Sequence, residues 1–147
     1  MRRQLITTAV SALLFACTST KGTVNTSVAN IQLPISNTDG TAFVLSKYST
    51  DKTYGYTEKN PILVGGVGNG PANERKYLNS LTGPNGETIS YVRMGSCCLF
   101  ESKNSPYGSG MLDKYKITYA GLEKEIVLYL NMYDAGNLLI PVGFKAK

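Results

Sequence analysis

The stretch that decides the fold is PILVGGVGNGPANERKYLNSLTGPNGETISYVRMGSCCLF, residues 61–100. Residues 62–64 form a short apolar run between a proline and a glycine pair, which predicts a buried strand. Apolar residues recur at helical spacing over residues 71–81, so we expect one short helix that packs on a sheet. A Gly-Pro pair ends this helix, Asn85-Gly86 makes a tight turn, and a strand from Thr88 to about Met94 follows.

A glycine-rich turn joins the first strand to the helix. It contains four glycines: Gly65, Gly66, Gly68 and Gly70. No register places three of them in the dinucleotide pattern G-x-G-x-x-G, and Pro71-Ala72 stands where a P-loop has Lys and Ser or Thr. Two interpretations remain. The turn holds an anion through free N–H groups at Gly66, Gly68 and Gly70, or it is a tight connection that needs close packing.

The first helical turn should begin at Pro71, because the missing N–H of proline has no helical partner there in any case. Glu74 is then expected in the first turn, where the helix dipole favours a carboxylate. Its neighbour Arg75 is a further candidate for contact with an anion.

The first sixteen residues are typical of an export signal. Arg2 and Arg3 precede an apolar run over residues 5–16, which is too short to span a bilayer as a mature helix. Leu-Phe-Ala-Cys at residues 14–17 resembles the bacterial lipobox, in which the cysteine becomes lipidated after cleavage. We therefore expect Cys17 to be the lipidated N-terminus, the alternative being an ordinary cleaved signal with a chance cysteine.

Cleavage at this point divides the chain into three parts. Residues 1–16 are the signal, residues 17–30 form a lipidated, flexible tether rich in Thr, Ser and Asn, and residues 31–147 form one domain. The chain has 15 Lys and Arg against 10 Asp and Glu, and the signal removes two of those cations. The remaining charge is mild, and no basic cluster alternates with aromatic residues, so we expect no nucleic-acid partner.

The second half of the chain has the periodicity of β-strands. Residues 112–119 alternate between apolar and polar side chains, which predicts a strand with one solvated face. Residues 125–133 are apolar on both faces and should form the central strand, paired with its predecessor as a hairpin. A strand at residues 42–45 is also possible. The expected fold is α+β, with one main helix on a mostly antiparallel sheet of about four to six strands.

No catalytic residue is assigned from the sequence. The chain has no histidine, which argues against Ser–His or Cys–His catalysis and weakens a zinc site. The carboxylates considered are Glu74, Asp113 and Asp134, and no two of them have a spacing that predicts an acid–base pair. We expect no metal and no cofactor, and the sequence favours a protein that is not an enzyme.

Three further residues near the end of residues 61–100 are candidates for ligand binding. Cys97 and Cys98 are adjacent, so they are buried small side chains, a vicinal disulfide in a loop, or a redox-active or ligand-binding pair. Arg93 shares its predicted strand face with Tyr91. Its guanidinium is aimed at an anion, or it reaches solvent at the end of that face.

Five short segments carry a resemblance to a known family: residues 70–75 (GPANER), 83–86 (GPNG), 95–98 (GSCC), 112–113 (LD) and 128–134 (LYLNMYD). The chain resembles a family of small bacterial lipoproteins without an assigned activity. Some members carry the name 2-dehydro-3-deoxyphosphooctonate aldolase. That name implies a TIM barrel, which needs roughly 200 or more residues and a repeated βα pattern, and this chain has neither.

Taken together, the signal and the absence of catalytic residues predict an exported protein anchored to the inner or outer membrane. The domain would face the periplasm or the cell surface and bind an envelope protein or glycan. The alternative is a small enzyme or ligand binder that uses the glycine-rich turn, Arg75, Arg93 and the pair Cys97–Cys98.

Overall fold

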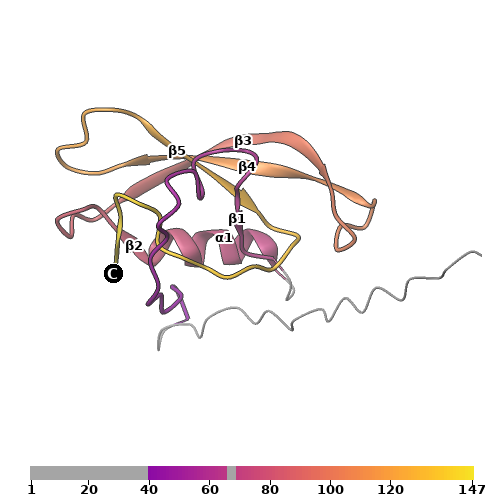
Figure 1. The fold of residues 1–147 in the computed structure, drawn as a ribbon, viewed down its shortest axis with the longest axis horizontal. Helices are drawn as coiled ribbons and strands as arrows, with labels where there is room; N and C mark the ends of the chain where they lie inside the picture. The colour runs from indigo at the N-terminus through magenta and orange to yellow at the C-terminus, as the bar shows by residue number, and fades with distance from the viewer. Residues whose placement is uncertain (1–39, 66–68) are drawn as a thin grey trace, which may run out of the picture.

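The computed structural model describes residues 40–65 and 69–147, and it confirms the α+β fold. One helix lies across one face of a four-stranded sheet, and a second sheet has two short strands (Figure 1). The elements in chain order are β1 (Ile62–Leu63), α1 (Gly70–Asn79), β2 (Leu81–Thr82), β3 (Ser90–Glu101), β4 (Ser109–Thr118), β5 (Ile126–Asn131) and β6 (Lys145–Ala146).

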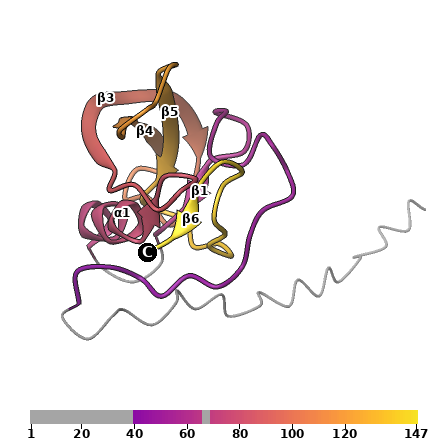
Figure 2. The same cartoon turned by 90° about the vertical axis from the view of Figure 1, so that its left-hand side faces the viewer.

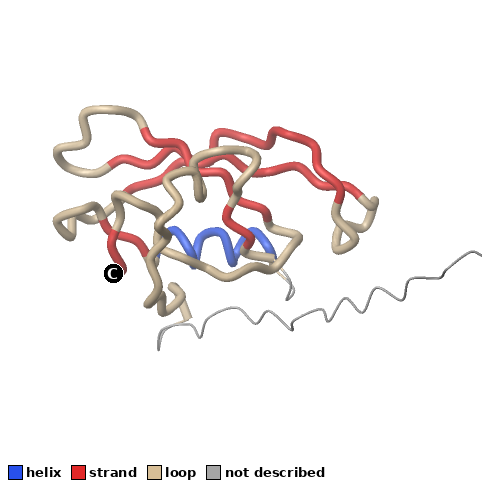
Figure 3. Tube along the Cα trace, in the orientation of Figure 1, coloured by secondary structure: helices blue, strands red, loops and turns tan. Residues whose placement is uncertain are grey.

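The main sheet has the order β1-β5-β4-β3. The strands are drawn in red in Figure 3. Strands β3, β4 and β5 pair antiparallel, whereas β1 pairs parallel with β5. The prediction that residues 125–133 form a central strand in a hairpin with its predecessor is confirmed, since β5 lies between β1 and β4. The small sheet pairs β2 with β6, which joins the chain after α1 to the C-terminus.

The core fills the space between α1 and the inner face of the sheet (Figure 2). Tyr77 and Leu78 of α1 are fully buried against Ile117, Leu128 and Leu130 of the sheet. Burial of each such side chain contributes about 1.5–3 kcal/mol, so this contact is the main reason that so short a helix is stable. The apolar C-terminal segment closes the core, and its buried residues are Leu138, Ile140 and Phe144.

The helix is shorter than the sequence predicted. It begins at Gly70, with Pro71 next, and its N-cap is Asn69. It ends at Asn79, because Ser80 caps it: Ser80 Oγ donates to the carbonyl of Lys76 (2.7 Å) and accepts from the backbone N–H of a distant residue, Phe43 (2.8 Å).

Two expectations about this helix are therefore wrong. Leu81 lies in β2 and pairs with Ala146, so it does not belong to the helix face. The first turn contains no acidic residue, and Glu74 lies one turn into the helix, on its buried face.

Strand β3 differs most from the expected strand at residues 88–94. It covers twelve residues and continues through both cysteines to Glu101. Its pairing with β4 shifts register twice, between Arg93 and Gly95 and between Cys97 and Leu99. Such bulges let a strand pass through irregular sequence without ending. The expected strand at residues 42–45 is absent from the structure, although Phe43 and Leu45 are buried in the core.

Two local predictions are confirmed. In β4, Tyr115 and Ile117 are buried while Lys114 and Lys116 are partly exposed, as the alternation indicated. Gly86 has a φ of 90°, which fits the tight turn that follows the helix.

Within the described ranges, no helix has the length and apolar character needed to cross a membrane.

Candidate functional site

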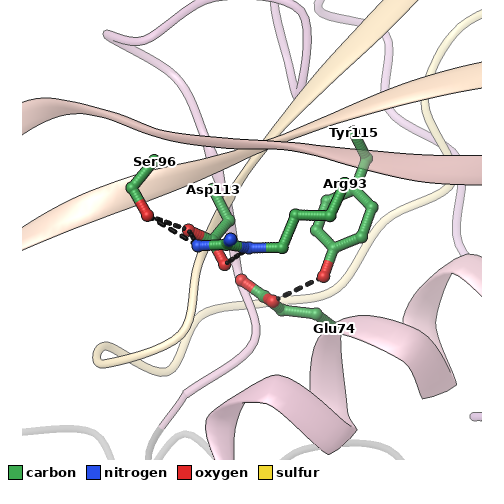
Figure 4. Close-up of polar contacts among 5 residues, drawn as sticks. All are labelled: Glu74, Arg93, Ser96, Asp113 and Tyr115. Atoms are coloured by element: carbon green, nitrogen blue, oxygen red, sulfur yellow. Dashed lines mark hydrogen bonds and ion pairs between the residues drawn. The ribbon is translucent and has the colours of Figure 1, made fainter.

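A cluster of polar side chains lies between α1 and the inner face of the sheet (Figure 4). We call it the carboxyl cluster, and its members are Glu74, Arg93, Ser96, Asp113 and Tyr115. Glu74 comes from α1, Arg93 and Ser96 come from β3, and Asp113 and Tyr115 come from β4. The register of the hairpin brings them together, because Arg93 pairs with Tyr115 and Ser96 pairs with Asp113.

Asp113 is held by two partners from β3. Arg93 Nε and Nη2 donate to the two carboxylate oxygens of Asp113 at 2.6 and 2.7 Å, and Ser96 Oγ lies 2.7 Å from Asp113 Oδ1. The side chain of Asp113 is 3% exposed, whereas that of Arg93 is 47% exposed. Burial raises the pKa of Asp113, but the hydrogen bonds from Arg93 and Ser96 outweigh it and hold the pKa below its ordinary value. Asp113 is therefore ionised.

Glu74 is in the opposite state. Glu74 is fully buried, and Tyr115 Oη donates a hydrogen bond to Glu74 Oε2 at 2.9 Å. Burial, followed by repulsion from Asp113, raises the pKa of Glu74 from 4.5 to about 7. Among the described residues, Glu74 Oε1 is the buried side-chain oxygen that lacks a hydrogen-bond partner.

A proton on Glu74 accounts for these observations together. A protonated carboxyl can donate from Oε1 to Asp113, and that hydrogen bond raises the pKa of Glu74 and lowers the pKa of Asp113. Figure 4 shows the carboxyl of Glu74 between the hydroxyl of Tyr115 and the Asp113–Arg93 pair. At pH values below about 7 the cluster thus contains one ionised and one neutral carboxyl group.

Such a pair of carboxyl groups resembles the arrangement that enzymes use for acid–base chemistry. Here both groups are covered by α1 and the sheet, and only Arg93 and Ser96 reach solvent. A substrate would have to displace part of this cover to contact either acid. The carboxyl cluster therefore links α1 to the sheet, and its exposed edge offers a guanidinium that is already paired.

No spacing in the sequence indicated this pair, because Glu74 and Asp113 lie far apart in the chain. A weaker signal was present at each position. Glu74 precedes Tyr77 and Leu78 by three and four residues, so it shares their buried helix face. Asp113 precedes Tyr115 and Ile117 in the inward alternation of β4. An acid on a buried face of two packed elements needs a partner.

The second feature is the cysteine pair, which forms a disulfide between adjacent residues of β3. It lies at the second register shift of that strand, and Cys98 has a φ of 59°. The interpretation as a vicinal disulfide is confirmed, although the disulfide lies in a strand and not in a loop. A redox or ligand-binding role of the pair stays a prediction.

The disulfide borders a groove of about 430 Å³, which we call the disulfide groove. Its lining residues come from the segment before β1, from β3 and from the two inner strands: Glu58, Lys59, Pro61, Cys98, Leu99, Phe100, Leu112 and Asn131. Most of the surface is apolar. Leu112 is buried beneath it, and Leu99 is 76% exposed at its edge.

The polar groups of the disulfide groove lie in two places. Asn131 is already occupied, since its Nδ2 donates to Asp134 (2.9 Å) and its Oδ1 accepts from the backbone N–H of Tyr133 (2.8 Å). Glu58 and Lys59 are solvent-exposed at the rim. The groove therefore combines an apolar surface with two adjacent charges of opposite sign.

The candidates from the sequence do not form one site. Gly70 supports the packing interpretation of the glycine-rich turn, because a Cβ there would lie 2.5 Å from the carbonyl oxygen of Met132. Arg75 is exposed on α1. Arg93 belongs to the carboxyl cluster and Cys98 to the disulfide groove. The remaining candidates, Cys17, Gly66 and Gly68, lie outside the described residues.

Comparisons with known proteins add no family assignment. No family model matches the chain, and neither a curated protein nor a solved structure matches it. Within residues 40–65 and 69–147, no group of three or more potential ligands is placed to hold a metal ion. The disulfide groove is therefore the feature on which a functional proposal can rest.

Proposed function

We propose that this protein is an exported, lipid-anchored binding module that is attached through Cys17 and binds its ligand in the disulfide groove. The signal-like residues 1–16 and the lipobox-like residues 14–17 support export and anchoring. The Cys97–Cys98 disulfide supports an oxidising location, because disulfides persist outside the cytosol and are rare within it.

The single observation that carries the binding proposal is the groove itself. Its volume of about 430 Å³ falls within the range of small-ligand sites, and its lining is mainly apolar. The neighbouring charges of Glu58 and Lys59 match the ammonium and carboxylate groups of a short peptide, while Leu99, Phe100 and Leu112 match apolar side chains. A short apolar peptide of the cell envelope is therefore the proposed ligand.

Anchoring is tested by labelling cells with radioactive palmitate. The wild-type protein should incorporate the label and sediment with membranes, and Cys17→Ala should do neither. A variant with Ser11→Ala, which leaves the lipobox-like residues intact, is the control. Unlabelled and freely soluble wild-type protein would remove the anchoring part of the proposal.

Binding is tested by a thermal-shift screen of residues 31–147 against short apolar peptides, followed by calorimetry of the best one. Leu99→Asp places a charge at the edge of the groove and should weaken binding at least tenfold, which is about 1.4 kcal/mol. Val92→Asp is the matched control, because Val92 is a similarly exposed residue of the same strand outside the groove. Equal affinities for the two variants would place the site elsewhere.

A further inference from the structure

The Cys97–Cys98 disulfide imposes an unusual backbone on β3. Side chains of adjacent strand residues point to opposite faces, and most disulfides join Cα atoms about 4.4–6.8 Å apart. Here the two Cα atoms are 3.8 Å apart, as in any trans peptide. The two sulfur atoms can meet only because the strand is irregular at this point, where its register with β4 shifts.

Cys98 is the one non-glycine residue with a positive φ among the described residues. At the other bulge of the same strand, the residue with a positive φ is a glycine: Gly95 has a φ of 117°. A side chain in this conformation is costly and persists only where the surrounding structure enforces it. The bond to Cys97 is the local constraint that can do so.

The disulfide is also open to a reactant. Both cysteines are only partly buried, and Cys98 lines the groove. A thiolate must approach a sulfur atom directly for exchange to occur, so access matters as much as the energy of the bond. The groove offers that access beside the exposed residue Leu99.

We propose that the Cys97–Cys98 disulfide accepts two electrons from a dithiol while the protein stays folded, and that its opening relaxes Cys98 and reshapes the disulfide groove. A thiolate of the dithiol attacks one sulfur, the Cys97–Cys98 bond breaks, and a mixed disulfide forms. The second thiol of the dithiol then displaces the protein sulfur. The dithiol leaves as a disulfide, and its two protons and two electrons remain as the thiols of Cys97 and Cys98.

The electron transfer is tested on the folded wild-type protein with dithiothreitol as the dithiol. N-ethylmaleimide should add two more groups to the reduced protein than to the oxidised protein under native conditions, because Cys17 is the same in both. The added mass is measured by mass spectrometry, while circular dichroism stays that of the folded protein. Mass addition that occurs only in denaturant would overturn the proposal. So would loss of the native spectrum at the same rate as reduction.

The relaxation of Cys98 is tested by two double variants that lack the disulfide, Cys97→Ser with Cys98→Gly and Cys97→Ser with Cys98→Ala. If the bond enforces the positive φ, opening frees the backbone, and the alanine variant should melt at the same temperature as the glycine variant or higher. A clearly higher melting temperature for the glycine variant would show that the bulge itself requires the positive φ. Reduction would then relax nothing, and that part of the proposal would be wrong.

The coupling to the groove rests on the proposed function, so its test separates the two. The apolar fluorophore anilinonaphthalene sulfonate serves as the probe for oxidised and reduced protein, with Leu99→Asp as the control for binding at this groove. Severalfold weaker binding after reduction supports the coupling, and equal binding overturns it. If the oxidised protein fails to bind the probe, the groove is not the binding site of the proposed function, and the coupling to it is wrong as well. The electron-transfer result would still stand, because it does not depend on the groove binding a ligand.

Discussion

Replacing Glu74 by glutamine tests whether the carboxyl cluster holds a proton. The carbonyl of glutamine can accept from Tyr115 and its amide can donate to Asp113, so Glu74→Gln reproduces the protonated acid and cannot ionise. The folded wild-type protein raises the pKa of Glu74 above its ordinary value. Its stabilising contribution is therefore fully present below the unfolded pKa and is lost as the pH rises through the folded pKa.

The size of this effect follows from the two pKa values, 4.5 unfolded and about 7 folded. At about 1.4 kcal/mol for each tenfold change in proton affinity, ionisation of Glu74 lowers the free energy of unfolding by about 3 kcal/mol between about pH 4 and about pH 8. The glutamine variant lacks this loss. The difference in stability between variant and wild type should therefore grow by about 3 kcal/mol in favour of the variant over this pH range.

The assay is urea unfolding of residues 31–147 at a series of pH values, followed by circular dichroism. Glu123→Gln removes the same formal charge from an exposed position and is the control. Titrating groups that do not contact residue 74 affect wild type and variant alike, so only the difference between their curves is informative. Parallel curves for Glu74→Gln and wild type from about pH 4 to about pH 8 would show that Glu74 is ionised in the folded protein, and the proton assigned to the cluster would be wrong.

Three further predictions concern stability; the first two are measured by urea unfolding and the third by amide hydrogen exchange. Arg93→Ala should cost about 1–3 kcal/mol, because it leaves the buried carboxylate of Asp113 with fewer donors; an unchanged midpoint would contradict its structural role. Gly70→Ala should cost about 1–3 kcal/mol, because the added methyl group meets the carbonyl of Met132; a neutral result would mean that this contact relaxes freely. Asp134→Ala should destabilise the turn after β5, since this carboxylate accepts from three side chains, and the amides near it should exchange faster than those of β4.

Periodicity predicted the parts of the fold whose side chains alternate or recur regularly. The alternation in residues 112–119 and the apolar residues 125–133 identified β4 and β5, because one or both faces of those strands are buried. The extent of β3 was missed for the opposite reason. Glycine, serine and two adjacent cysteines are typical of a turn, and only pairing with β4 keeps the strand continuous through its two bulges.

The site was less predictable than the fold, because its members meet only in three dimensions. Glu74 and Asp113 each stand on a buried face, but nothing in the spacing indicates that those faces touch at this point. The end of the helix also depends on a contact between distant parts of the chain. Ser80, which caps the helix, accepts a hydrogen bond from the backbone N–H of Phe43, 37 residues away. The disulfide was weighed from the sequence as one of three options, and its connection with a groove depended on the loop before β1.

The pairing of early and late parts of the chain has a consequence for how the protein is made. Ile62 of β1 pairs with Leu130, and Leu81 of β2 pairs with Ala146. Neither sheet can be completed until these much later residues have been made, and the contacts close very long loops. Late folding of this kind keeps the nascent chain unfolded for longer, which is the state that passage through a membrane channel requires if the protein is exported as proposed.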